Sequence, residues 1–288
     1  MAASSITALT ITKVNHLESL ETSDALAIEE PLEIRLEYGP KEHRSTQNIS
    51  VTMRTPGNDA ELALGFLFTE GILQKQEDIA QIEHCFIACA ENKENVIQVS
   101  LSETVVPHLQ NTGRNFYTTS SCGVCGKGSI NAIRTVGTYI NQQDHNTIEA
   151  AILHHLPAIL TQHQKVFADT GGLHASALFT PAGELLLVRE DVGRHNALDK
   201  LIGAALNKNW LPLTNNILLL SGRASFELVQ KAAMAGITVI AAVGAPSSLA
   251  VQLAEEFNIT LVGFLRNNRF NIYTAAHRIV LPEYEITH

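Results

Sequence analysis

The first part of the chain alternates apolar and polar positions in short stretches, as strands do. Leu32–Tyr38 shows the clearest alternation and predicts a strand with one buried face. Glu61–Gly71 has the length and composition of a helix, with Asn58 or Asp59 placed to cap its start and Gly71 to end it. Further strands are predicted at Ile6–Lys13, Ile49–Arg54 and Asn95–Leu101.

Beyond about residue 130, helical and strand patterns take turns. Helices are predicted at Ile130–Val136, Thr147–His163, from about Asn196, Ser225–Met234 and Ser247–Phe257, and strands at Glu184–Val188, Ile217–Ser221, Thr238–Val243, Thr260–Phe264, Phe270–Thr274 and His277–Leu281. Such alternation indicates parallel strands with helices packed on them. The sequence therefore predicts a mixed α/β fold, with a β-rich part over residues 1–115 that carries one helix and an α/β part over residues 116–288.

Composition narrows the classes of function. Hydrophobic residues make up 45% of the 288 residues, charged residues 17%, and the formal net charge is −9. An acidic protein does not hold nucleic acid through a general basic field, so a phosphate-bearing ligand would have to meet local arginines. Neither a membrane-spanning apolar run nor a signal peptide is recognisable, so we expect a cytoplasmic protein without a membrane partner.

Two cysteines stand in a run of small, polar and glycine residues, Thr118–Gly128. Cys122 and Cys125 form a CxxC pair on what the composition predicts to be a mobile loop, where a low thiol pKa favours nucleophilic sulfur chemistry. The alternative is a structural zinc site completed by Cys85 and Cys89. Those two cysteines lie in an apolar segment, so we interpret them as core residues.

Two other motifs can be excluded because required residues are missing or stand in the wrong order. The Gly126-Lys127 pair resembles a phosphate-binding P-loop only superficially, because the first glycine and the Ser or Thr after the lysine are missing. The His174–Ser176 and CxxC segments resemble the zinc deaminase motifs, yet Ser176 stands where the catalytic Glu belongs and the order is reversed. A P-loop ATPase and a working zinc deaminase are therefore not expected.

Polar residues gather where the predicted strands end, and ligands bind at strand ends in α/β sheets. His174 follows a glycine pair, His195 lies in the run Arg189–Lys200, and Arg223 stands between a strand and a helix, where an anion can be held. The segment Phe264–Arg269 offers arginines, amides and an aromatic ring, which suit a purine nucleotide. An ordinary cap, a satisfied histidine or a polar hairpin turn remains the alternative at each place.

Taken together, seven segments resemble the FdhD/NarQ family of formate dehydrogenase accessory sulfurtransferases. The similarity runs in consistent order from about residue 45 to the C-terminus. It rests on Arg54–Gly57, Glu61–Gly71, Ser121–Lys127, Gly171–Ala175, Glu190–Lys200, Ser221–Arg223 and Gly263–Arg266.

The resemblance implies a specific activity and fold. It implies a three-layer core similar to cytidine deaminases. It also implies transfer of sulfane sulfur from a cysteine desulfurase to the bis-molybdopterin guanine dinucleotide (bis-MGD) molybdenum cofactor, for formate dehydrogenase. Cys122 would carry the persulfide, Cys125 would assist, GDP would mimic the cofactor, and the protein would be a homodimer. The expected cofactor-binding residues are Phe264, Leu265, Arg266, Asn267, Asn268, Arg269, Arg223, His195 and His174. The alternatives are a cofactor-binding chaperone without covalent sulfur transfer and a zinc-stabilised binding protein.

Overall fold

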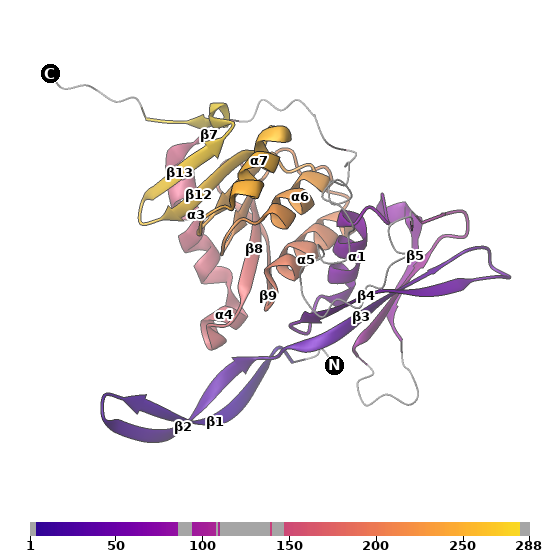
Figure 1. The fold of residues 1–288 in the computed structure, drawn as a ribbon, viewed down its shortest axis with the longest axis horizontal. Helices are drawn as coiled ribbons and strands as arrows, with labels where there is room; N and C mark the ends of the chain where they lie inside the picture. Colours follow the sequence, from indigo (N-terminus) through magenta and orange to yellow (C-terminus); the bar gives the residue numbers. More distant parts are fainter. Residues whose placement is uncertain (1–3, 86–93, 108, 110–138, 140–146, 283–288) are drawn as a thin grey trace.

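A six-stranded mixed sheet forms the centre of the molecule (Figure 1). The computed structural model describes residues 4–85, 94–107, 109, 139 and 147–282. In spatial order the strands are β13 (Arg269–Thr274), β12 (Thr260–Arg266), β11 (Val239–Ala242), β10 (Ile217–Leu220), β8 (His174–Phe179) and β9 (Leu185–Asp191). The three inner strands β10, β11 and β12 are parallel, while β8, β9 and β13 continue the sheet antiparallel.

Helices cover both faces of this sheet and make three layers. Alternate strand residues point to opposite faces, so Leu218 and Leu220 pack with helices α5 (Arg194–Asn207), α6 (Phe226–Met234) and α7 (Ser248–Glu256). Ile217 and Leu219 face the other way and pack with α3 (Ala150–His163). This arrangement confirms the predicted α/β class, in which each helix buries one apolar stripe against the sheet.

A second sheet extends the core on the α5 side. Its order is β4 (Ser45–Arg54), β3 (Glu30–Tyr38), β6 (Val96–Leu101) and β5 (Ile79–His84). The predicted alternation of β3 is present, since Leu32, Ile34 and Leu36 are fully buried and the residues between them are not. Helix α1 (Asp59–Thr69) lies between this sheet and α5, and all of them share one hydrophobic cluster.

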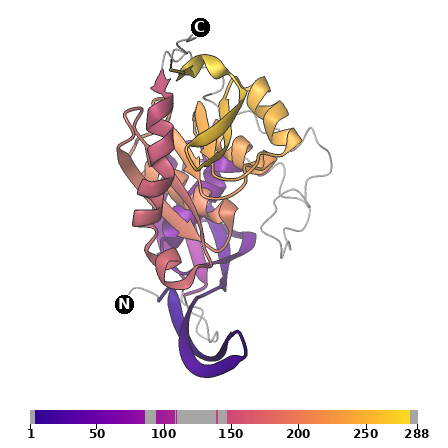
Figure 2. The ribbon, with the colours of Figure 1, turned by 90° about the vertical axis from the view of Figure 1, so that its left-hand side faces the viewer.

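A long two-stranded hairpin leaves the body of the molecule. Strands β1 (Ile6–Asn15) and β2 (Glu18–Ala27) pair along their whole length and protrude in both views (Figures 1 and 2). Only the base of the hairpin meets the body, at the short helix α4 (Lys165–Thr170). The remaining elements are β7 (Ile148–Glu149), which pairs with β14 (Ile279–Val280), and two 3-10 turns at Gln76–Asp78 and Ala276–Arg278.

The structure differs from the sequence-based expectations at several elements. The predicted strand His277–Leu281 begins within the 3-10 turn Ala276–Arg278, and only Ile279–Val280 form a strand, β14. Strand β2 was not predicted because Glu18, Glu21 and Asp24 give it a polar composition, and β5, β8 and α4 were also not predicted. Strand β8 is buried on both faces, so its apolar run shows no alternation. The predicted helix Ile130–Val136 and the boundary near residue 115 lie outside the described residues, so both stay predictions.

The interpretation of Cys85 as a core residue is wrong. Cys85 follows the edge strand β5, is only partly buried, and places its Sγ 3.5 Å from Gln98 Oε1. Burial raises the pKa of the Cys85 thiol, which makes it a poor nucleophile. Cys89 lies outside the described residues.

Candidate functional site

The carboxyl ends of the parallel strands meet at one edge of the large sheet, and their loops are bonded to one another. Gly244 N, after β11, donates to Gly222 O, after β10, over 2.9 Å. Phe264 N, on β12, donates to Gly244 O over 3.0 Å. The three strand ends therefore form one continuous ledge of backbone, which we call the strand-end ledge (Gly222, Gly244 and Phe264).

Glycine is required along this ledge because other groups approach it closely. A Cβ atom at Gly244 would lie 3.0 Å from Gly222 O, and one at Gly263 would lie 2.7 Å from Pro246 Cδ. At Gly222 the nearest atom would be Nδ1 of His174, at 3.3 Å. The imidazole of His174 thus rests against bare backbone at the end of β10.

His174 lies among positive charges at this edge. It is the first residue of β8, pairs in register with Asp191 at the end of β9, and is half-buried. Burial lowers the pKa of His174 below its usual value of 6.5, and nearby Arg194, His195 and Arg223 lower it further. His174 is therefore neutral at pH 7, and an anion that offset the neighbouring cations would favour its protonated form.

His195 is held by a carboxylate. Its Nε2 lies 2.8 Å from Oε2 of Glu227, which belongs to the first turn of α6, and 3.5 Å from Ser225 Oγ. Both His195 and Glu227 are largely shielded from solvent. Donation from Nε2 to Glu227 fixes the ring orientation of His195 beside the ledge. Sequence reasoning missed Glu227, although an acidic residue soon after Ser221-Gly-Arg223 at a helix start was a usable signal.

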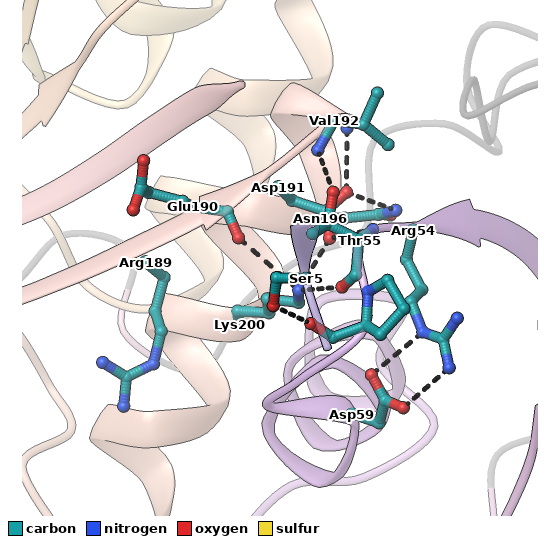
Figure 3. Close-up of polar contacts among 12 residues, drawn as sticks. Ser5, Arg54, Thr55, Asp59, Arg189, Glu190, Asp191, Val192, Asn196 and Lys200 are labelled. Atoms are coloured by element: carbon teal, nitrogen blue, oxygen red, sulfur yellow. Dashed lines mark hydrogen bonds and ion pairs between the residues drawn. The ribbon is translucent and has the colours of Figure 1, made fainter. Parts of the chain in front are cut away.

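A buried carboxylate anchors the second sheet to this edge (Figure 3). Asp191 is fully buried at the end of β9, and its Oδ2 lies 2.7 Å from Nζ of Lys200 on α5. Oδ1 accepts from Gly193 N over 2.8 Å, and Oδ2 accepts from Thr55 N over 3.2 Å. Burial raises the pKa of Asp191, and the Lys200 ammonium opposes that shift. The network joins the β4–α1 loop to the strand ends.

A second buried ion pair, between Arg54 and Asp59, also holds the β4–α1 loop in place. Arg54 is fully buried at the end of β4, and its guanidinium donates to both carboxylate oxygens of Asp59, at 3.1 and 2.9 Å (Figure 3). This bidentate geometry is among the stronger ion-pair arrangements. Arg54 and Asp59 therefore hold the start of α1 in place, and Thr55 with it.

A pocket of about 410 Å³ opens beside this network, lined by residues that include Thr55, Lys165, Glu190 and Lys200. Two of its charged groups make contacts within the protein. Glu190 accepts from Val166 N and Phe167 N of α4, and Lys200 donates to Thr55 O over 2.8 Å.

The segment Phe264–Arg269 bends away from regular strand geometry. Phe264 has a φ of 56°, and an extra residue on β12 between Gly263 and Arg266 makes a bulge. Arg266 lies with its guanidinium 5.9 Å from the Phe264 ring. Asn267 and Asn268 have φ of 53° and 55° and form the hairpin turn, after which Arg269 pairs with Arg266.

Leu265 differs from the other expected cofactor-binding residues because its side chain is buried in the core. It is only 1% exposed and packs in the core on the α3 side of the sheet. Its side chain points into that core because the bulge turns it there, so only its backbone is available to a ligand. The structure brings His174, His195 and Arg223 together and adds Arg194, while Arg266, Asn267, Asn268 and Arg269 lie exposed around the hairpin turn.

Cys122 and Cys125 lie outside the described residues, so their position relative to the ledge stays a prediction. Within the described part of the chain, no group of three or more His, Cys, Asp or Glu side chains is arranged to hold a metal ion. The same residues include no helix that is long and apolar enough to cross a membrane.

Comparison with known proteins places the chain in a family. The chain is 52% identical over 273 residues to the sulfur carrier protein FdhD of Mycolicibacterium paratuberculosis, covering 93% of this chain and 97% of that protein. It is 42% identical over 271 residues to the FdhD protein of Sulfolobus acidocaldarius, with 94% and 97% covered.

A solved structure shares the fold. It is described as that of a formate dehydrogenase accessory protein from Desulfotalea psychrophila, and it superposes with a TM-score of 0.73 at 24% identity, over 96% of this chain and 100% of that one. The family model described as FdhD/NarQ matches residues 27–280. The chain therefore belongs to the FdhD/NarQ family.

Proposed function

We propose that this protein is a sulfurtransferase that accepts sulfane sulfur on Cys122 and passes it to the bis-MGD molybdenum cofactor, its substrate, for formate dehydrogenase. The names of its relatives, which are sulfur carrier proteins, support the carrier role. The observation that supports binding of the cofactor is that His174 and Arg223 lie together at the strand-end ledge. A cysteine desulfurase is the sulfur donor in this proposal, and the cytoplasm is the compartment.

The sulfur chemistry needs only thiols. The Cys122 thiolate attacks the outer sulfur of a desulfurase persulfide, the S–S bond of that persulfide breaks, and the desulfurase leaves as a thiolate. In the second step the Cys125 thiolate attacks Sγ of Cys122, and the outer sulfur leaves as sulfide toward the metal of the substrate. The two-electron reduction of that sulfur is balanced by formation of the Cys122–Cys125 disulfide. An external thiol must then reduce the disulfide before the next cycle.

The described residues fit the phosphate groups of such a substrate. Arg194 and Arg223 supply positive charge next to His174, and arginine suits the phosphate groups of a dinucleotide. The Nε atom of Arg194 is buried and has no hydrogen-bond partner among the described residues. In this proposal Phe264 and the amides of Asn267 and Asn268 recognise the guanine, and GDP binds as a mimic.

Sulfur transfer is tested by intact-mass spectrometry after incubation with a cysteine desulfurase and cysteine. We expect one added sulfur atom, located at Cys122 by digestion, in the wild type and in Cys125→Ala. Cys122→Ala should gain none and should still bind GDP. Labelling at Cys125 in the absence of Cys122 would contradict the assignment of the carrier cysteine.

A cofactor chaperone is the second candidate, because the same ledge would serve binding without any sulfur chemistry. The sulfurtransferase and chaperone hypotheses can be distinguished by complementation of a strain that lacks the gene for this protein. If Cys122→Ala and Cys125→Ala both restored formate dehydrogenase activity, the chaperone would be correct. If stoichiometric zinc were bound and were lost in Cys122→Ala, a zinc-stabilised protein would be correct instead.

A further inference from the structure

His195 and Glu227 connect two helix starts beside the strand-end ledge. His195 is the second residue of α5, and Glu227 is the second residue of α6. Nε2 of His195 lies 2.8 Å from Oε2 of Glu227, and the two side chains are only 7% and 13% exposed. Ser225 Oγ is farther from Nε2, at 3.5 Å. Glu227 is therefore the main partner of this imidazole nitrogen.

A carboxylate at this place needs an explanation, because the groups around it suit an anion. Two arginines, Arg194 and Arg223, lie close to His174 at the same edge. Like charges repel, so Glu227 by itself would weaken the binding of a phosphate there. An acid in the first turn of α6 interacts favourably with the helix dipole, yet α5 and α7 begin without one. The helix start alone thus does not require Glu227.

The bond to Glu227 determines which nitrogen of His195 is left for a ligand. An ionised carboxylate only accepts hydrogen bonds, so the nitrogen that faces it carries a proton in both the neutral and the charged imidazole. That nitrogen is Nε2. Within the described part of the chain, the hydrogen-bonding contacts of the His195 side chain all involve Nε2. Nδ1 is therefore the nitrogen available to a bound molecule.

We propose that Glu227 is a positioning residue for phosphate binding at the strand-end ledge, where it holds the ring of His195 so that Nδ1 donates to a phosphate oxygen of the ligand. This inference rests on the proposed function, in which the ledge binds the phosphates of a guanine dinucleotide. In the bound state both ring nitrogens donate, Nε2 to Glu227 and Nδ1 to the phosphate, which requires a protonated imidazole. The imidazolium then lies between two anions, and charge-assisted hydrogen bonds of this kind are among the stronger ones.

The substitution Glu227→Ala separates positioning from a simple charge effect, because the two explanations predict opposite signs. If Glu227 acts only through its charge, its removal from an anion site should tighten GDP binding. If Glu227 positions His195, Glu227→Ala frees the ring, and GDP binding measured by calorimetry should weaken at least about tenfold. Glu227→Gln should stay within about threefold of the wild type, since its amide oxygen can still accept from Nε2. Glu255→Ala removes the same charge at the exposed C-terminal end of α7, and GDP affinity should not change.

A double-mutant cycle tests whether Glu227 acts through the imidazole. In a His195→Ala background there is no ring to position, so Glu227→Ala should no longer weaken GDP binding. A substitution that merely disturbed α6 would weaken binding by the same factor in both backgrounds, and that result would overturn the proposal.

NMR of the imidazole nitrogens in the wild-type protein supplies a readout that needs no substitution. We expect Nε2 of His195 to carry a proton with and without GDP, and Nδ1 to carry one in the GDP complex. A bare Nε2 in the free protein would overturn the proposal, as would a Glu227→Ala variant that binds GDP as tightly as the wild type. Failure of the wild type to bind GDP would instead count against the proposed cofactor binding, and the NMR measurement would still test the orientation of His195.

Discussion

Gly65 on α1 and Gly203 on α5 face one another at the point where the two helices cross. A Cβ atom on Gly65 would collide with Asp199 O, and one on Gly203 would collide with Glu61 O. The helices therefore meet backbone to backbone, as small residues at a helix contact allow. This contact joins the second sheet to the large one, because α1 packs on β6 and α5 packs on β8 and β9.

Gly203→Ala should destabilise the protein because backbone on the opposing helix cannot give way. Overpacking of this kind costs about 1–3 kcal/mol or more, which corresponds to a fall in Tm of several degrees. The measurement is thermal unfolding by circular dichroism. Gly172→Ala is the control, since the nearest atoms to its Cβ would lie 3.9 Å away. Equal Tm values for the two variants would contradict the close crossing.

Lys200→Met should cost about 3–5 kcal/mol, because it leaves Asp191 buried without its cation. The measurement is urea unfolding. The loss should be smaller at low pH, since an unpaired buried carboxylate is tolerated once it is protonated, and stability then falls as pH rises through its raised pKa. The double variant Asp191→Asn/Lys200→Met should recover part of the stability. Additive losses would show that the two side chains act independently.

His174 should titrate below 6.5 in the free protein, followed by NMR of its ring protons. Because the unfolded chain takes up a proton that folded His174 refuses, this residue makes stability fall as pH drops below about 6.5, and His174→Gln should reduce that slope. GDP should raise the pKa of His174, since its phosphates offset the cations Arg194 and Arg223. GDP binding should therefore tighten toward lower pH. An unchanged His174 titration in saturating GDP would place the phosphates elsewhere.

Arg223→Ala should weaken GDP binding at least about tenfold, measured by calorimetry, because a hydrogen bond to a charged group contributes about 1.5–3 kcal/mol. Arg35→Ala is the matched control, since Arg35 lies on β3 in the second sheet and pairs there with Glu33. The two variants remove the same charge from the chain, so a nonspecific charge effect would lower affinity equally in both. Only a local contact at the ledge lowers it in Arg223→Ala alone.

The local elements of the fold were predictable because their signals are local. Strand β3 alternates, and α1 ends at Thr69, two residues before Gly71, whose φ is 74°. The helix–strand order from Arg194 onward matches the structure within a few residues. Polar residues near predicted strand ends singled out His174, His195 and Arg223 one by one, and the structure shows that the three lie near one another. Strands β2 and β8 were missed because neither alternates between apolar and polar residues. Strand β2 is polar throughout much of its length, and β8 is buried on both faces.

The sequence by itself determined the fold class, the CxxC spacing of Cys122 and Cys125, and the family resemblance. Only the tertiary structure decided which distant groups meet. Glu227 reaches His195 because α6 starts beside α5, and Lys200 reaches Asp191 because α5 packs along β9. Leu265 turns into the core because of a bulge whose register is set by β13. These outcomes depend on contacts between residues far apart in the chain, and the free energy of such contacts is not encoded in any local pattern.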